Sequence, residues 1–198
     1  MTHRRASKPR DGDRGATLVE GVLVTAVVVA LAIGTIEFGN AWRQTTVVDK
    51  TIQQSARVVA SVADGPLADY EALQTFRSLI DSSKDMELEY LVIFKSSSSD
   101  GAVPTACRTA SQSNICNRYV PADLTRSSSD FGSCSYPSPD RYWCPTARVR
   151  DREPWPDYVG VYAQMRYTGV TKALPNGLPI TRTAVYALEP CAFGLPGC

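Results

Sequence analysis

The sequence predicts an α+β protein in which a long N-terminal helix packs on a small antiparallel sheet. An apolar run begins at Ala16, and a segment with helical periodicity continues it without a break to about Ala63. Strand-like alternation of apolar and polar residues comes only later, between Met86 and Leu188. Helices first and strands afterwards are typical of α+β folds, and 198 residues suit one domain with an anchor.

The chain starts with a basic stretch, residues 1–15, which carries five Lys or Arg residues against two Asp residues. Residues 16–36 follow, an apolar run whose one charged residue is Glu20. A helix of this length spans about 31 Å, enough to cross the hydrocarbon core of a bilayer. Because Lys and Arg are retained on the cytoplasmic side, we expect a single-pass protein of the cytoplasmic membrane, with residues 37–198 outside. The alternative is a cleaved secretory signal with its cleavage site at Ala30–Ala32.

The apolar run does not end at a helix stop. After Glu37 the apolar residues continue with helical periodicity, and the first helix-breaking sequence is Asp64–Pro66. One face of this continuation holds Val48, Ile52, Ser55, Ala56, Val59 and Val62. One helix from Ala16 to about Ala63 is therefore predicted, and any bend is expected at Gly34 or Gly39.

The spacing of small residues in the apolar run suggests a packing face. Ala26, Ala30 and Gly34 are four residues apart, which lets helices approach closely in lipid, although small residues are also ordinary in spanning helices. At the outer exit, Trp42 is expected to anchor the helix at the membrane interface, and Glu37 is expected to be a solvated flanking residue.

The second half of the chain predicts one more helix and three strands. Pro66 suits the first position of a helix that ends near Ile80. Its apolar stripe comprises Leu67, Tyr70, Leu73, Phe76 and Ile80. The predicted strands are Met86–Phe94, Asp157–Tyr167 and Pro179–Leu188, with a turn at Pro175–Gly177.

All six cysteines follow the apolar run, which suits an oxidising compartment and three disulfides. Four of them lie in residues 95–157, where turn and loop composition predicts a long excursion that needs cross-links. The spacings suggest that neighbouring cysteines pair. These candidate pairs are Cys107–Cys116, Cys134–Cys144 and Cys191–Cys198. No metal site is expected, because the chain lacks a C-x-x-C pair and its one histidine, His3, lies in the basic stretch.

The ordered features of the N-terminal part resemble those of TadE-like proteins, minor pilins of bacterial tight-adherence (Flp-type, type IVc) pilus systems. The matching features are "RGA" at 14–16, "VE" at 19–20, the apolar helix, "IEFG" at 36–39 and "QSAR" at 54–57. The terminal "AVYALEP", residues 184–190, resembles the closing strand of such ectodomains. The resemblance implies a pilus-assembly component whose partners are the membrane, a prepilin peptidase, other pilins and pilus-assembly proteins.

The resemblance also implies roles for residues near the start of the helix. Prepilin peptidases cut after a Gly that follows a basic leader, which places cleavage between Gly15 and Ala16 and makes Glu20 the fifth mature residue. Type IV pilins use this Glu to meet the N-terminal ammonium of a neighbouring subunit. Gly21 departs from the bulky residue that commonly follows the Glu. The alternative is that Glu20, about 7.5 Å above Gly15, reaches the interface and has no role.

Enzyme chemistry is not expected. The single histidine is in the basic stretch, no phosphate-binding glycine loop is present, and the cysteines lack the partners of a nucleophile. We expect no cofactor, and the near-neutral charge gives no indication of nucleic-acid binding.

A second interaction is suggested by residues 135–162, which are rich in Tyr, Trp, Arg and Pro. This composition is favoured at binding hot spots, so the region is a candidate contact for a partner or a surface ligand. The alternative is that Trp143 and Trp155 cover the disulfides and fill the core. The second functional hypothesis is therefore a permanently anchored extracytoplasmic binding or adhesion module that never enters a filament.

Overall fold

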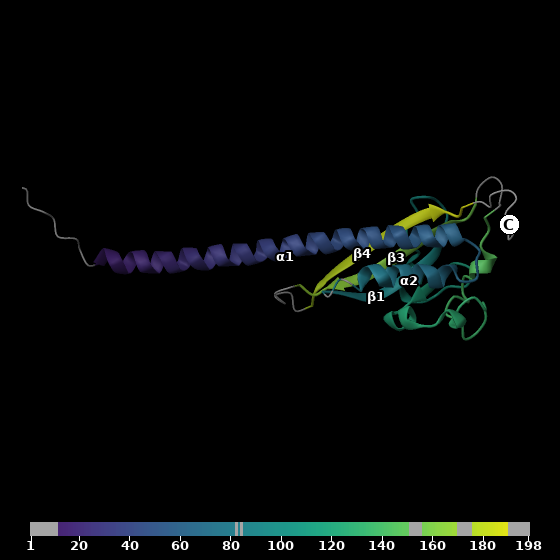
Figure 1. The fold of residues 1–198 in the computed structure, drawn as a ribbon. Coiled ribbons are helices and arrows are strands. Elements are labelled where there is room, and N and C mark those ends of the chain that lie inside the picture. The colour runs from purple at the N-terminus through teal and green to yellow at the C-terminus, as the bar shows by residue number, and fades with distance from the viewer. Residues whose placement is uncertain (1–11, 82, 84, 151–155, 170–175, 190–198) are drawn as a thin grey trace, which may run out of the picture.

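The structure is a computed structural model that describes residues 12–81, 83, 85–150, 156–169 and 176–189. It consists of one long helix that extends far beyond a small α+β ectodomain (Figure 1). This helix, α1, covers Gly12–Val62 and is about 76 Å long. The predicted single helix is thus confirmed, and it runs through Gly34 and Gly39 without interruption.

The second half of α1 buries the predicted apolar face against the sheet and a second helix. Val48, Ile52 and Val59 are 0% exposed there. The chain leaves α1 at Ala63, whose positive φ of 51° turns it away from the helix axis. The second helix, α2 (Ala68–Ile80), begins later than predicted because Pro66 lies in the preceding turn.

Four strands form one antiparallel sheet in the order β2-β1-β3-β4. The strands are β1 (Met86–Ser96), β2 (Cys116–Tyr119), β3 (Tyr158–Tyr167) and β4 (Leu178–Ala187). Three of them were predicted within two residues of these bounds. Of the turn predicted at Pro175–Gly177, only Pro175 lies outside the described residues; Asn176 is in a turn, and Gly177 has a φ of 62°.

The description of residues 95–157 as a loop excursion is wrong in part. The short strand β2 pairs with β1, with Leu91 opposite Tyr119 and Phe94 opposite Cys116. The excursion also contains α3 (Thr105–Thr109) and the 3-10 helices η1 (Pro121–Thr125), η2 (Ser128–Asp130) and η3 (Pro145–Ala147). Sequence periodicity misses β2 because four residues are too few to show it, and the pairing depends on a distant strand.

The inner strands β1 and β3 are buried on both faces of the sheet, whereas β4 is mostly exposed or partly exposed. The alternating β3 residues face the helices as predicted, and they are all buried in the main core: Val159, Val161, Ala163, Met165 and Tyr167. A second cluster on the opposite face contains Tyr90, Val92 and Phe94 under Cys107 and Cys116. The cysteine-rich excursion therefore covers the face of the sheet that the helices leave open.

Two of the three predicted disulfides are confirmed. Cys107–Cys116 joins α3 to β2 with its Cα atoms 6.2 Å apart, and Cys134–Cys144 closes a loop with its Cα atoms 5.3 Å apart. The third predicted pair, Cys191–Cys198, lies outside the described residues.

Candidate functional site: the exposed half of the long helix

The first half of α1 leaves the ectodomain and exposes apolar side chains all round. We call Thr17–Ile36 the exposed segment, because every side chain in it is exposed. The large apolar residues range from Leu18 at 70% to Ile33 at 43% exposed. A helix that is apolar all round is stable only within lipid or among partners. By length and hydropathy, α1 is the one helix among the described residues that could cross a membrane.

The predicted site residues of the exposed segment lie on this single helix without contact to the ectodomain. Glu20 is exposed and has no hydrogen bond or ion pair among the described residues. Gly15 and Ala16 precede it by about one helical turn, inside α1. The small residues Ala26, Ala30 and Gly34 are exposed too. No counter-charge for Glu20 is therefore present among the described residues.

The exposed segment ends at a contact that the sequence did not predict. The Tyr167 hydroxyl at the end of β3 donates to Glu37 Oε2 at 3.3 Å. Gly169, whose φ is +75°, approaches the same carboxylate, and a Cβ there would lie 3.2 Å from Glu37 Oε2. The expectation that Glu37 is a solvated flanking residue is thus wrong, because the end of the sheet covers it in part. Trp42 is 69% exposed, as an interface anchor would be in the absence of lipid.

A buried polar network ties the excursion to α2, and sequence analysis missed it. The carboxylate of Asp69, which is 0% exposed, forms an ion pair with Arg148 and accepts hydrogen bonds from Tyr119 Oη at 2.6 Å and Asn117 Nδ2 at 2.9 Å. Burial, and then the neighbouring Asp69 carboxylate, raises the pKa of Tyr119 well above its ordinary value. The raised pKa keeps Tyr119 neutral inside the domain.

Trp143 belongs to the core next to this network. It is 3% exposed, its backbone exchanges two 2.8 Å hydrogen bonds with Asn117, and the Arg148 guanidinium lies 4.3 Å from its ring centroid. The alternative expectation, that Trp143 fills the core, is confirmed. Trp155 lies outside the described residues.

One aromatic residue of the predicted contact region does face solvent. Tyr136, inside the loop closed by Cys134–Cys144, is 84% exposed. The Arg141 guanidinium lies 5.5 Å from the Tyr136 ring centroid and 4.4 Å from that of Tyr142. Such a stacked group has the composition of a contact surface.

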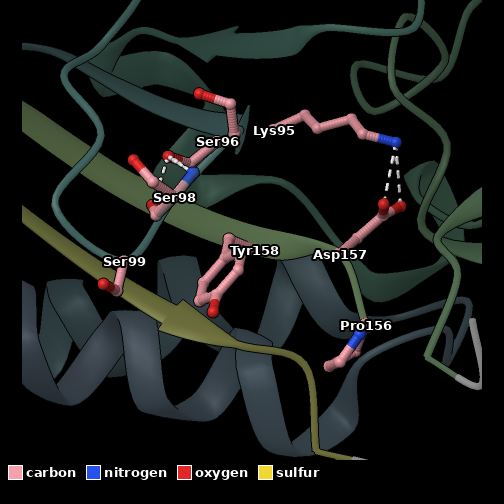
Figure 2. A pocket seen from close by; sticks show the side chains of 8 residues that line it. Lys95, Ser96, Ser98, Ser99, Pro156, Asp157 and Tyr158 are labelled. Atoms are coloured by element: carbon pink, nitrogen blue, oxygen red, sulfur yellow. Dashed lines mark hydrogen bonds and ion pairs between the residues drawn. The ribbon is translucent and has the colours of Figure 1, made fainter. Parts of the chain in front are cut away.

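A cleft of about 430 Å³ lies at the end of β1, between the serine-rich turn and the start of β3 (Figure 2). Its lining carries hydroxyl groups, but Ser96 Oγ already donates to the Ser98 carbonyl at 2.7 Å. Lys95 Nζ faces Asp157 at 2.9 Å, so the two charges balance each other. No imidazole or thiolate among the described residues lines the cleft to act as a base or nucleophile.

The order of these features along α1 coincides with a match to a known family. The matching segment begins at the glycine before the exposed segment, includes Glu20 and Glu37, and ends within the packed half of the helix. Residues 15–57 match the family model described as TadE-like protein. The resemblance is thereby confirmed over this TadE-like segment. No curated protein and no solved structure matches the chain in the corresponding comparisons.

Proposed function

We propose that the chain is a minor pilin or pilus-assembly component of a tight-adherence pilus system, anchored in the cytoplasmic membrane by the exposed segment. The observation that carries the proposal is the coincidence of the TadE-like segment with a helix that is apolar and exposed below Glu37 and packed on an ectodomain above it. Residues 1–15 face the cytoplasm, and the ectodomain lies outside.

Processing and assembly both depend on the start of α1. A prepilin peptidase cuts between Gly15 and Ala16 and leaves a new ammonium group about one helical turn below Glu20. Residues four apart share a helix face, so Glu20 can meet its own ammonium before assembly and that of a neighbouring subunit afterwards. An unpaired charge in low dielectric is strongly unfavourable, and this pairing therefore sets the axial register between subunits.

The direct test is mass spectrometry of the N-terminus in cells with and without the cognate prepilin peptidase. The proposal predicts a chain that starts at Ala16 when the peptidase is present and at the uncut leader when it is absent. A Gly15→Val variant should remain uncut in both strains. A mature chain that starts at Ile33 would contradict the proposal and indicate secretion.

A permanently anchored binding module is the second candidate function, and the exposed Tyr136 favours it. A large aromatic side chain that is 84% exposed on a disulfide-closed loop gains no burial within its own fold. This candidate predicts an uncut chain in the envelope and loss of ligand binding on Tyr136→Ala at unchanged thermal stability. Unfolding of that variant would remove the argument for a contact.

A further inference from the structure

We infer that the ectodomain makes a second contact with the membrane, through an apolar rim at the end of the sheet where α1 emerges. The proximal rim consists of Phe38 and Trp42 on α1 and Leu178 and Pro179 at the start of β4. Its occupant is the outer interfacial layer of the bilayer. The inference rests on the proposed function only in that α1 spans a membrane.

The height of the rim along α1 follows from the length of the apolar run. The hydrocarbon core is about 30 Å thick, which a helix from Ala16 crosses by Ile36. The interfacial layer adds about 5–8 Å on each side, or roughly the next five helical residues. Glu37 and Trp42 therefore bound this layer on α1. The sheet reaches the same level, because Tyr167 at the end of β3 donates to Glu37.

The start of β4 lies at this level as well. Leu178 is paired directly with Tyr167 in the antiparallel register. Figure 1 shows this end of β4 beside the middle of α1, where the helix leaves the ectodomain. The end of the sheet is thus held against the helix where the interfacial layer begins.

The exposure of the rim has no explanation within the fold. Phe38 is 72%, Trp42 69% and Leu178 44% exposed, and Pro179 is exposed too. At the opposite end of β4, Leu188 follows the strand and is 0% exposed. The fold therefore buries the apolar residue at the distal end of this strand and leaves the one at the membrane end open. Aromatic and apolar side chains at this level gain burial in the interfacial layer.

Charges of both signs lie at the same end: exposed Arg43 follows Trp42 on α1, and Arg166, opposite Pro179 in the sheet, forms an ion pair with Glu89. Asp85, whose carbonyl accepts a hydrogen bond from Thr168, and the exposed Asp81 and Glu87 lie toward α2 and β1 rather than toward β4. These acids stay hydrated and disfavour an anionic surface at their side of the sheet. The β4 side thus enters the interface by apolar burial, and the contact should persist at high salt.

The test uses the full chain in phosphatidylcholine nanodiscs with p-benzoylphenylalanine introduced at single positions. Position 178 is compared with position 149 at the distal end, where Val149 has a similar exposure of 39%. Position 28, in the exposed segment, reports whether α1 is in lipid. After irradiation, lipid adducts are quantified by mass spectrometry, and the urea unfolding midpoint verifies that each labelled protein is folded.

We expect lipid adducts at 28 and 178 with similar yield, none at 149, and no change in high salt. Adducts at 28 without adducts at 178 would overturn the second contact and leave the membrane anchor intact. Cross-links from 178 to another protein copy would overturn it as well and assign the rim to a subunit interface. Absence of adducts at 28 would contradict the membrane anchor itself and, with it, this inference.

Discussion

Two acidic residues of this chain lie in apolar surroundings, and the fold treats them in opposite ways. Asp69, in the first turn of α2, is fully buried and has an ion pair with Arg148 and hydrogen bonds from Tyr119 and Asn117. Glu20, in the exposed segment, has no such partner among the described residues. The ectodomain thus supplies partners for its buried carboxylate, whereas the described residues supply none for Glu20.

This difference indicates that the ectodomain and the exposed segment are stabilised by different partners. The ectodomain supplies the partners of Asp69 from two separate parts of its own chain, β2 and the residue after η3. The described residues supply neither apolar cover for the exposed segment nor a counter-charge for Glu20. Under the proposed function, lipid provides the cover, and another subunit or the chain's own new N-terminus provides the counter-charge. Substitutions in the first region should change folding, and substitutions in the second should change assembly.

Removal of the buried acid should have the largest effect on folding. Asp69→Ala leaves the buried Arg148 without its counter-charge, and we expect a loss of about 3–5 kcal/mol in the free energy of unfolding, measured by urea titration in detergent. Asp49→Ala is the control, because Asp49 lies 3.9 Å from Arg182 with both side chains partly exposed. We expect it to cost less than about 1 kcal/mol. Equal losses in Asp69→Ala and Asp49→Ala would refute the claim that the buried ion pair matters more for folding than the partly exposed one.

The two halves of α1 should respond differently to loss of apolar volume. Ile52→Ala creates a cavity at a residue that is 0% exposed, and we expect the ectodomain to lose about 2–5 kcal/mol. Val28→Ala removes carbons that no part of the ectodomain contacts, since Val28 is 57% exposed. We expect the ectodomain's unfolding midpoint in urea to stay unchanged. A matching shift from Val28→Ala would show that the two halves fold as one unit.

Two glycines, one in the ectodomain and one in the exposed segment, allow a similar comparison with a smaller expected effect. A Cβ at Gly160 of β3 would overlap the Phe94 ring, whereas a Cβ at Gly34 would meet nothing within 4 Å. We therefore expect Gly160→Ala to destabilise the ectodomain by about 1–3 kcal/mol and Gly34→Ala to leave it unchanged in thermal unfolding. If Gly160→Ala were neutral, the close packing of Phe94 across β3 would be refuted.

The smallest effect concerns alkaline pH. The pKa of Tyr119 is raised above 10.0 by burial and by Asp69. The unfolded chain therefore releases this proton at lower pH than the folded chain, and stability falls as the pH rises above about 10. The urea unfolding midpoint of the unsubstituted chain should be lower above this pH than below it. Tyr119→Phe should show a smaller decline, and an equal slope in both proteins would remove Tyr119 as its cause.

Local patterns sufficed to predict α1, α2, the three long strands and two disulfides. Each of these elements carries its own signal, such as the periodicity from Val48 to Val62 or the nine-residue separation of Cys107 and Cys116. The strand β2 and the Asp69 network carried no local signal. The strand pairs with residues 22–28 positions away, and the network joins residues 48–79 positions apart. The contact between Glu37 and Tyr167 was missed for the same reason, since 130 residues separate the two partners.

For the candidate site, the sequence identified the residues of the helix but not the surface that the fold assembles beside them. Gly15, Ala16 and Glu20 could be named from the sequence because their roles depend on order along one helix. The partners proposed for them belong to other molecules, so processing and pairing remain predictions. The proximal rim could not be found from the sequence, because it joins α1 to the start of β4 only through the folded sheet.

Under the proposed function, Glu20 is matched by positive charge when subunits assemble. The most direct measurement compares Glu20→Gln with the charge-retaining Glu20→Asp, with incorporation into purified filaments quantified by mass spectrometry. Both variants should insert and be cut normally. Glu20→Gln should lose at least about tenfold in incorporation, which corresponds to roughly 1.4 kcal/mol of pairing, and Glu20→Asp should lose less. Incorporation of Glu20→Gln at the level of the unsubstituted chain would contradict the claim.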